Sequence, residues 1–481
     1  MLSEKNKAVK ASMGYTLGNY LIRGLGFITI PIFSRLLSPT DFGLYNTFLA
    51  YEGIVYILIG LALNGSLKNA KNRFKNEIDQ YTSSVMLIPI IILGGFICIW
   101  LLGNDWLIKI LKIDSFSVLM LLIYSYASSL LTFYQTRISL DYNYLEYLRI
   151  SLFNAVFSVV LSLLFIFIFF NNNRYYGRIV GATITYILLA IYVMMSLWLK
   201  AKPKFNKKYW SYALKISIPL VPHGLAQILL LSFDRIMINS MIGSMEAGIY
   251  SFAYTVYSLV SITATSLDTV YSTWVFQKYN KEEKQTEIKS VGTSFMLVIG
   301  GICSLVILLA PEVIKILGGN KYSEAVYCTI PVILAGFFAM AYCIPAVMEY
   351  YYEKTKYISM GTIIAAATNM VLNLTFIPKY GYIAAAYTTL FSYIIYFLLH
   401  MYISKRLSGF YIIEIKYLLS VLLILIISYG IGLAFVNNLF VRLVTGGILV
   451  YIEIILLFKI YGKENVYNII KRILGGRKYE R

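Results

Sequence analysis

Apolar runs of about 20 residues recur along the whole chain, and they constrain its fold more than any other feature. A helix that spans a bilayer needs roughly 20 mostly apolar residues, because the hydrocarbon core is about 30 Å thick. Backbone polar groups inside the bilayer must be paired within the segment, so such runs must be helices. Of the 481 residues, 59% are hydrophobic and 14% are charged, whereas about a quarter of a soluble globular chain is charged. The sequence therefore predicts an all-α integral membrane protein with no soluble domain.

We expect fourteen transmembrane helices joined by short connections. The first apolar run follows a basic N-terminal segment, as in a secretory signal, but it continues to about Leu37 with no small-residue cleavage site. We therefore expect it to be retained as the first span. The expected spans lie near 11–36, 42–64, 82–103, 116–136, 150–170, 177–199, 213–239, 247–273, 291–310, 326–348, 357–377, 381–403, 414–435 and 439–458.

The distribution of basic residues tests this count. With a cytoplasmic N-terminus and fourteen crossings, 31 of the 42 Lys and Arg residues lie on or beside inner segments and 9 on outer ones. The other two, Arg23 and Arg235, fall inside spans. Inner loops of membrane proteins carry such an excess. The pattern predicts a multi-pass protein of the cytoplasmic (inner) membrane with both termini cytoplasmic. The net charge of +19 is mostly this bias, and no nucleic-acid partner is expected because no basic soluble module exists to bind one.

A short pattern occurs twice, 205 residues apart, as SPTDFGLY at 38–45 and GSMEAGIY at 243–250. Each copy is typical of a helix start: Ser38 is a candidate N-cap, Pro39 suits the first helical position, and Asp41 completes a capping box. We therefore expect the acid to cap its helix. Six spans separate the copies, which predicts two parallel six-helix bundles with a pathway between them. The predicted parts are 1–205, 206–406, and a pair of additional spans with a cytoplasmic tail at 407–481.

Several of these motifs resemble those of a known family. GNYLIR at 18–23 and RLLSPTDFGLY at 35–45, followed by PLVP at 219–222 and DRIMI at 234–238, resemble the polysaccharide-transporter (Wzx-type) flippases of the multidrug/oligosaccharidyl-lipid/polysaccharide exporter superfamily. The resemblance covers essentially the whole chain. It implies a flippase and not an enzyme, with no cofactor. The expected substrate is a polyprenyl-diphosphate-linked oligosaccharide for O-antigen or capsule, moved by alternating access, with membrane lipids and polysaccharide polymerase machinery as partners. It also implies that spans thirteen and fourteen hold the lipid tail.

Ionisable groups inside spans are the candidates for transport chemistry, because such groups are costly in lipid. Arg23 lies near the middle of span one, and Gly24 and Gly26 lie beside it in the sequence. A guanidinium binds phosphate oxygens in a bidentate way, so we expect Arg23 to face a wet cavity and hold the diphosphate. The alternative is a structural ion pair with Glu52 of span two.

Span seven carries a second group of candidates. Asp234 and Arg235 leave the helix in different directions, and both substrate contact and a structural role remain open for them. Pro219 and Pro222 should bend the span and form a hinge. His223 could contact a phosphate or bond the carbonyls that the prolines leave free.

The remaining candidates are acids. Glu52, Asp234 and Asp268 are expected to couple transport to protons or sodium, whereas Glu453 and His400 are expected at the membrane interface. No metal-ligand spacing occurs, and the four cysteines are expected to be apolar helix residues, so no metal is predicted.

Two other functions compete with the flippase. A cation-coupled drug exporter of the same fold would need a carboxylate-rich apolar pocket, and the positive charge of Arg23 argues against one. A glycosyltransferase or polymerase should carry a large outer loop, but the longest outer loop spans only about 311–325.

Overall fold

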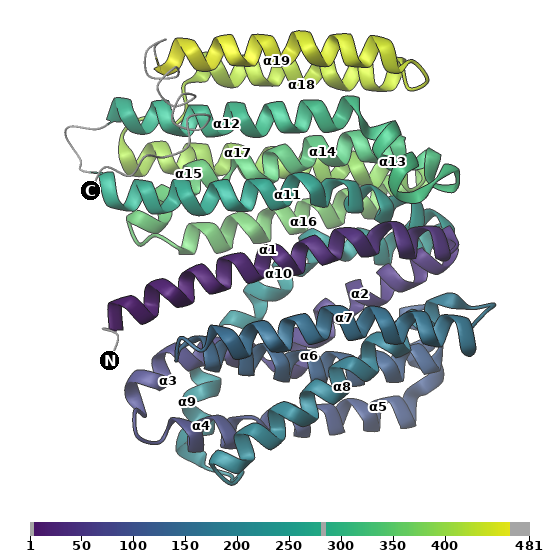
Figure 1. The fold of residues 1–481 in the computed structure, drawn as a ribbon, viewed down its shortest axis with the longest axis vertical. Coiled ribbons are helices and arrows are strands. Elements are labelled where there is room, and N and C mark those ends of the chain that lie inside the picture. The colour runs from purple at the N-terminus through teal and green to yellow at the C-terminus, as the bar shows by residue number, and fades with distance from the viewer. Residues whose placement is uncertain (1–3, 280–284, 462–481) are drawn as a thin grey trace. The chain divides into compact units, whose positions relative to one another are not determined.

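The computed structural model describes residues 4–279 and 285–461, apart from several side chains within residues 4–23, that of Arg23 among them. All regular secondary structure in this part of the chain is helical (Figure 1), which confirms the predicted all-α class. The chain divides into two compact units, Met1–Ser251 and Phe252–Arg481. We describe each unit by itself.

The first unit consists of ten helices, one 3-10 turn and the beginning of α11. The elements are α1 (Glu4–Leu36), α2 (Pro39–Gly60), η1 (Leu63–Ser66), α3 (Leu67–Arg73), α4 (Ile78–Val85), α5 (Leu87–Leu111), α6 (Ser115–Ser139), α7 (Tyr144–Ile168), α8 (Arg174–Lys200), α9 (Lys207–Ser217) and α10 (Leu220–Met241). Helix α9 packs on η1 and α10 packs on α2. The first unit therefore extends past residue 205, and the repeat boundary expected there stays a prediction.

The second unit contains most of α11 and the remaining helices. Its elements are α11 (Ser244–Lys278), α12 (Gln285–Leu308), α13 (Ala310–Gly318), η2 (Asn320–Ala325), α14 (Val326–Ala341), α15 (Cys343–Tyr351), α16 (Lys356–Tyr380), α17 (Ile383–Ser408), α18 (Ile415–Ala434) and α19 (Leu439–Tyr461). The last two helices lie side by side and both pack on α12 (Figure 1).

Twelve helical segments of the described chain are long and apolar enough to cross a membrane, and each coincides with an expected span. The multi-pass prediction is therefore confirmed. The other two expected spans, 11–36 and 247–273, coincide with α1 and α11, which are 33 and 35 residues long. At 1.5 Å per residue, either helix exceeds the thickness of a bilayer core. Among the described residues of α1, however, only the shorter segment Gly24–Leu36 is apolar overall, and α11 is rich in Ser and Thr. The count of fourteen stays a prediction.

Contacts between loops show that successive long helices of the first unit run in alternate directions. At one end, Arg174 donates to the Leu36 carbonyl over 2.7 Å and Lys112 donates to the Ser240 carbonyl over 2.6 Å. At the opposite end, which we call end B, Tyr209 donates to Glu77 over 2.7 Å. Alternate connections thus meet at the same end, as expected if every long helix crosses the bilayer.

The second unit alternates in the same way. At one end Tyr279 and Tyr352 share a hydrogen bond of 2.8 Å between their hydroxyls. At the other end Arg442 of α19 forms a bidentate ion pair with Glu312 of α13, with two nitrogen–oxygen distances of 2.6 Å. Arg442 is 1% exposed. This pair ties the α18–α19 hairpin to α13.

The two repeat motifs form helix starts that pack against each other. Ser38 caps α2 with a capping box, in which the Asp41 amide donates to the Ser38 hydroxyl over 3.0 Å and Pro39 occupies the first turn, as predicted. A side chain on Gly43 would lie 1.8 Å from the Ser244 carbonyl oxygen. A side chain on Gly248 would lie 1.9 Å from the Pro39 carbonyl oxygen. The paired glycines therefore allow the backbones of α2 and α11 to touch.

The seventh expected span is interrupted at its first proline. Helix α9 ends at Ser217 and α10 begins at Leu220, with Ile218 and Pro219 between them. The Val221 amide bonds the Ile218 carbonyl over 3.1 Å instead of a carbonyl four residues back. Proline has no amide proton to donate, which accounts for the break. The helix is interrupted where a bend was expected, and the bend itself and its use as a hinge stay predictions.

Candidate functional site

A polar cluster rich in tyrosine surrounds Glu52 inside the first unit. Glu52 of α2 is half-buried, and its carboxyl group lies close to Ser128 of α6. One turn further along α2, Tyr56 lies close to Thr132. The ring of Tyr186 from α8 lies 4.5 Å from that of Tyr124, measured between centroids. An acid and hydroxyls inside a spanning bundle are costly in lipid. This cluster is therefore the strongest candidate for a transport site within the first unit.

A half-buried cation lies near this cluster and was not identified from the sequence. Arg178, in the second turn of α8, stacks on the ring of Phe33, with its guanidinium carbon 3.6 Å from the ring centroid. The ring centroid of Tyr45 lies 5.2 Å from the same carbon, and Arg178 also donates to Ser162 over 3.2 Å. From its place at the edge of a span, Arg178 was counted with an outer loop. The signal in the sequence was its position inside the expected span 177–199.

The structure separates the two adjacent charges of span seven. Asp234 is fully buried and accepts a hydrogen bond from Tyr250, the tyrosine of the second repeat motif. Arg235 is half-buried and donates to Ser232 over 3.0 Å. Asp234 thus holds α10 against the start of α11. The roles of both residues in binding or coupling stay predictions.

His223 lies in the first turn of α10 beside Pro222. Its ring is half-buried, and Nδ1 has no hydrogen-bond partner among the described residues. The alternative in which this nitrogen bonds the carbonyls freed by Pro219 and Pro222 is therefore not what the structure shows. A buried ring nitrogen without a partner leaves His223 able to bind a phosphate or a water molecule.

The other two sequence candidates differ in how far the structure describes them. The Arg23 side chain lies outside the described residues, so the choice between a cavity role and an ion pair with Glu52 stays a prediction. Asp268 of α11 is half-buried in the second unit, near Tyr271 and Cys343. Asp268 and the cluster around Glu52 belong to separate units, so a shared role in coupling stays a prediction.

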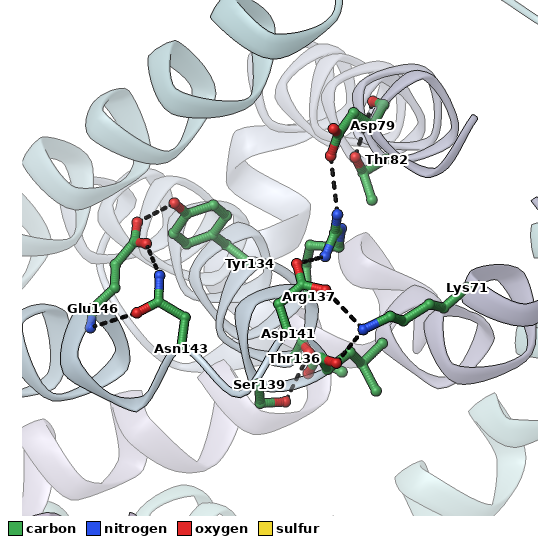
Figure 2. A network of polar contacts seen from close by, with 11 residues as sticks. Lys71, Asp79, Thr82, Tyr134, Thr136, Arg137, Ser139, Asp141, Asn143 and Glu146 are labelled. Carbon is green, nitrogen blue, oxygen red and sulfur yellow. Dashed lines mark hydrogen bonds and ion pairs between the residues drawn. The ribbon is translucent and has the colours of Figure 1, made fainter. Parts of the chain in front are cut away.

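A network of charged side chains at end B was also not predicted from the sequence (Figure 2). Arg137 of α6 bonds Asp79 of α4 over 3.0 Å and also bonds Asp141, and Lys71 of α3 reaches Asp141 over 2.7 Å. Burial raises the pKa of Asp141, but the hydrogen bond from Lys71 and the charge of Arg137 outweigh it, so the pKa lies below its ordinary value. The network ties together three helices and the turn before α7. Its members are up to 70 residues apart, so no local pattern could have paired them.

In the same view, Glu146 in the first turn of α7 accepts hydrogen bonds from Tyr134 and from Asn143, the latter over 2.7 Å (Figure 2). Tyr134 in turn bonds Ser196 of α8 over 2.9 Å. Both groups of contacts in Figure 2 therefore act between helices of the first unit at end B.

The second unit buries polar groups where the sequence predicted interfacial ones. His400 is fully buried and lies 2.5 Å from the Glu349 carboxylate, and Glu453 is 8% exposed with its carboxyl group against the backbone of Gly301. Both side chains are therefore enclosed by the protein, and their expected place at the membrane interface stays a prediction. Lys405 and Lys459 lie nearby in the sequence and suggested a membrane edge. Tertiary packing nevertheless covers the side chains of His400 and Glu453.

A polar ladder joins α16 to α17 in the second unit. Asn369 donates to Thr389 over 3.0 Å, Asn373 donates to Asn369 over 3.0 Å, and Thr388 donates to Asn373. These amides satisfy one another inside a spanning segment. Within the described residues, no group of three or more His, Cys, Asp or Glu could hold a metal ion.

Known proteins resemble this chain along most of its length. An uncharacterized membrane protein of Methanocaldococcus jannaschii is 23% identical to this chain, and the aligned region covers 98% of this chain and 100% of that protein. The capsular polysaccharide biosynthesis protein CapF of Staphylococcus aureus is 22% identical over 79% of this chain and 95% of its own.

Solved structures share the fold. The lipid II flippase MurJ, in an inward closed conformation, matches with a TM-score of 0.74 at 16% identity, covering 92% of this chain and 98% of that one. An inward-facing multidrug transporter of the MATE family matches less closely, with a TM-score of 0.58 at 12% identity over 79% of this chain and 95% of that one.

The family of polysaccharide biosynthesis proteins matches residues 8–271, more than half of the chain. The matched segment includes both repeat motifs, the cluster around Glu52 and the charge network at end B. This multi-pass membrane protein belongs to the polysaccharide biosynthesis protein family.

Proposed function

We propose that the protein is a flippase for a polyprenyl-diphosphate-linked oligosaccharide, the repeat unit of a surface polysaccharide such as O-antigen or capsule. It would move this unit from the cytoplasmic to the outer leaflet of the cytoplasmic membrane. The observation that carries the proposal is the family to which the chain belongs. The fold shared with a lipid II flippase supports it. The protein itself then catalyses no bond change and needs no cofactor.

The residues supply a mechanism for this function. Half-buried Tyr56 and Tyr186 offer amphipathic rings on which sugars can stack, and Glu52 beside them can accept sugar hydroxyls. Arg23 and Arg235 are the groups that we assign to the diphosphate, because a guanidinium fork matches phosphate oxygens.

Movement of the halves would use the break in span seven. Pro219 and Pro222 form the hinge, and His223 donates to the phosphate when that span rearranges. The two six-helix bundles would rock about the bound head group while the lipid tail stays in the bilayer.

Orientation and partners complete the proposal. Both termini lie in the cytoplasm, as the 31-to-9 division of basic residues suggests. Protons or sodium drive the cycle through Glu52, Asp234 or Asp268, and polymerase machinery receives the product at the outer leaflet. A cation-coupled drug exporter is the second candidate, because the fold is also shared with MATE transporters.

The experiment that tests the function is complementation of a strain that lacks its own flippase, with membrane levels measured in parallel. Arg23→Ala should abolish glycan export, whereas Arg23→Lys should retain part of it, because a point charge lacks the bidentate fork. Arg406→Ala is the matched control, since Arg406 is an exposed arginine in the last turn of α17.

The double variant Arg23→Ala/Glu52→Gln separates the two interpretations of Arg23. A purely structural pair predicts that export returns when both charges are removed, whereas diphosphate binding predicts that it stays lost. Normal export by a well-expressed Arg23→Ala protein would refute the assignment of Arg23 to diphosphate binding. Export of a cationic drug without glycan export would favour the second candidate.

A further inference from the structure

The second unit contains a buried acid–histidine pair that no part of the proposed mechanism uses. Glu349 lies near the end of α15 and His400 lies within α17, and both side chains are fully buried. His400 Nδ1 is 2.5 Å from Glu349 Oε1. The second heteroatoms, Glu349 Oε2 and His400 Nε2, have no hydrogen-bond partner among the described residues.

The surroundings of the pair are aromatic and uncharged. The rings of Tyr342 and Tyr396 lie 5.3 and 4.6 Å from that of His400, measured between centroids. On the α16 side, a side chain at Gly361 would lie 2.8 Å from His400 Nε2, so the missing Cβ makes room for the ring. The Tyr396 hydroxyl bonds Thr362 over 3.0 Å and is occupied.

Other polar groups on the neighbouring elements are few. Cys343 and Tyr350 belong to α15, and Ser404 lies one turn beyond His400 on α17. Asp268 of α11 lies near Cys343 and Tyr350. Within the described residues, Glu349 and His400 contact each other and neither forms an ion pair with a Lys or Arg. The pair therefore has no neighbouring cation to fix its charge.

Structural stability alone is a poor explanation for such a pair. A buried polar atom left without a partner costs about 1–3 kcal/mol, and a buried ion pair is on balance no more stabilising than apolar residues of the same volume. A half-satisfied polar pair is thus costly unless its open positions are used. Histidine is the side chain that gains and loses a proton in the physiological pH range.

We propose that Glu349 and His400 together form a proton-binding site in the second unit, and that its loading is coupled to transport. The ligand is a single proton. In the empty state the neutral imidazole donates its Nδ1 proton to the carboxylate, so the site carries one negative charge. A proton taken up at Nε2 or Oε2 makes the site neutral overall. A net charge is costly inside a spanning bundle, so the loaded and empty states favour different packing of α15 against α17.

The coupling part of this inference rests on the proposed transport function, whereas proton binding does not. The first experiment therefore needs no substrate. The purified full-length protein is titrated with acid and base, and the carboxyl stretching bands are followed by infrared difference spectroscopy. We expect a protonatable carboxyl band that disappears in Glu349→Gln and changes its midpoint in His400→Asn. Glu453→Gln, which removes another buried carboxyl of a spanning helix, should leave that band in place.

The second experiment measures coupling in vesicles that contain the protein and a fluorescent polyprenyl-diphosphate-linked saccharide. A pH gradient should change the flipping rate of the unaltered protein several-fold. Glu349→Gln should still flip the lipid down its own gradient but lose the pH response, and the double variant with His400→Asn should lose no more than either single one.

The outcomes are distinguishable. A carboxyl titration that persists unchanged in Glu349→Gln would overturn the proton site, as would a full pH response in both single variants. Failure of the unaltered protein to move the lipid would count against the flippase function alone, because the infrared titration needs no lipid-linked saccharide. If Glu349→Gln folds poorly, an unchanged midpoint of the band in His400→Asn still refutes the site.

Discussion

Substitution of Gly43 tests the contact between the two repeat motifs most directly. An added Cβ at this position would lie 1.8 Å from the Ser244 carbonyl oxygen and 2.7 Å from the Gly248 amide nitrogen. Real Cβ atoms stay beyond 3.0 Å from such atoms, and both neighbours here are backbone, which no rotamer change can move. The start of α2 must therefore shift by roughly 1 Å relative to that of α11.

The expected cost follows from what such overpacking does elsewhere. Forcing one extra carbon into a packed contact destabilises a fold by about 1–3 kcal/mol, and more where backbone must move. We therefore expect Gly43→Ala to lower the thermal midpoint by several degrees in detergent. Gly248→Ala should do the same, because its Cβ would lie 1.9 Å from the Pro39 carbonyl oxygen. The two costs should not add, since either change opens the same contact.

The assay is thermal unfolding of the detergent-solubilised protein, followed by size-exclusion chromatography of the fraction that stays monodisperse. Gly95→Ala is the matched control, because Gly95 lies inside α5, is exposed and has nothing within 4 Å of its added Cβ. That control should keep or raise the midpoint, as alanine favours a helix interior. An unchanged midpoint in Gly43→Ala would refute the reasoning, because the contact could not then be backbone against backbone.

Three further predictions concern the ion pairs. Arg442→Ala should cost about 3 kcal/mol of stability and release the α18–α19 hairpin, because it leaves Glu312 unpaired; limited proteolysis after the change should cut near 435–438, and an intact hairpin would contradict it. The pKa of Asp141 is depressed in the folded protein, so its contribution is present above the ordinary value of 3.8 and lost below it; a thermal midpoint that stays flat from pH 5 to about 3 would contradict this. Burial raises the pKa of Glu312, but the hydrogen bond from Arg442, a backbone hydrogen bond and the charge of Arg442 together outweigh it, so this pKa is also depressed, and Arg442→Ala should remove part of the same acid sensitivity.

The sequence was sufficient for the features that depend on local physics. Apolar runs long enough for a bilayer predicted the spanning helices, and twelve of them are confirmed. The capping box at Ser38 and the break before Leu220 followed from the hydrogen-bonding chemistry of serine and proline, and both are present. Each of these features is decided within a few residues.

Features that depend on which helices meet could not be predicted in this way. Arg137 pairs with Asp79, which is 58 residues away, and His400 pairs with Glu349, which is 51 residues away. A single sequence contains no signal for such distances. His400 was assigned to the interface because Lys405 and Arg406 mark a helix end one turn further on. The packing of α15 and α16 against α17 buries it all the same.

The repeat motif is the exception, and its geometry explains why a long-range feature was visible in the sequence. Gly43 faces the backbone beside Gly248, and Gly248 faces the backbone beside Gly43, so each position is subject to the same steric limit. The tyrosine two residues later is also placed by this contact, since Tyr250 reaches the buried Asp234. When two helix starts touch through equivalent backbone atoms, each needs a glycine at the same position of its motif, here Gly43 and Gly248. A pattern repeated at 205 residues can therefore indicate contact between its copies as well as common descent of the two halves.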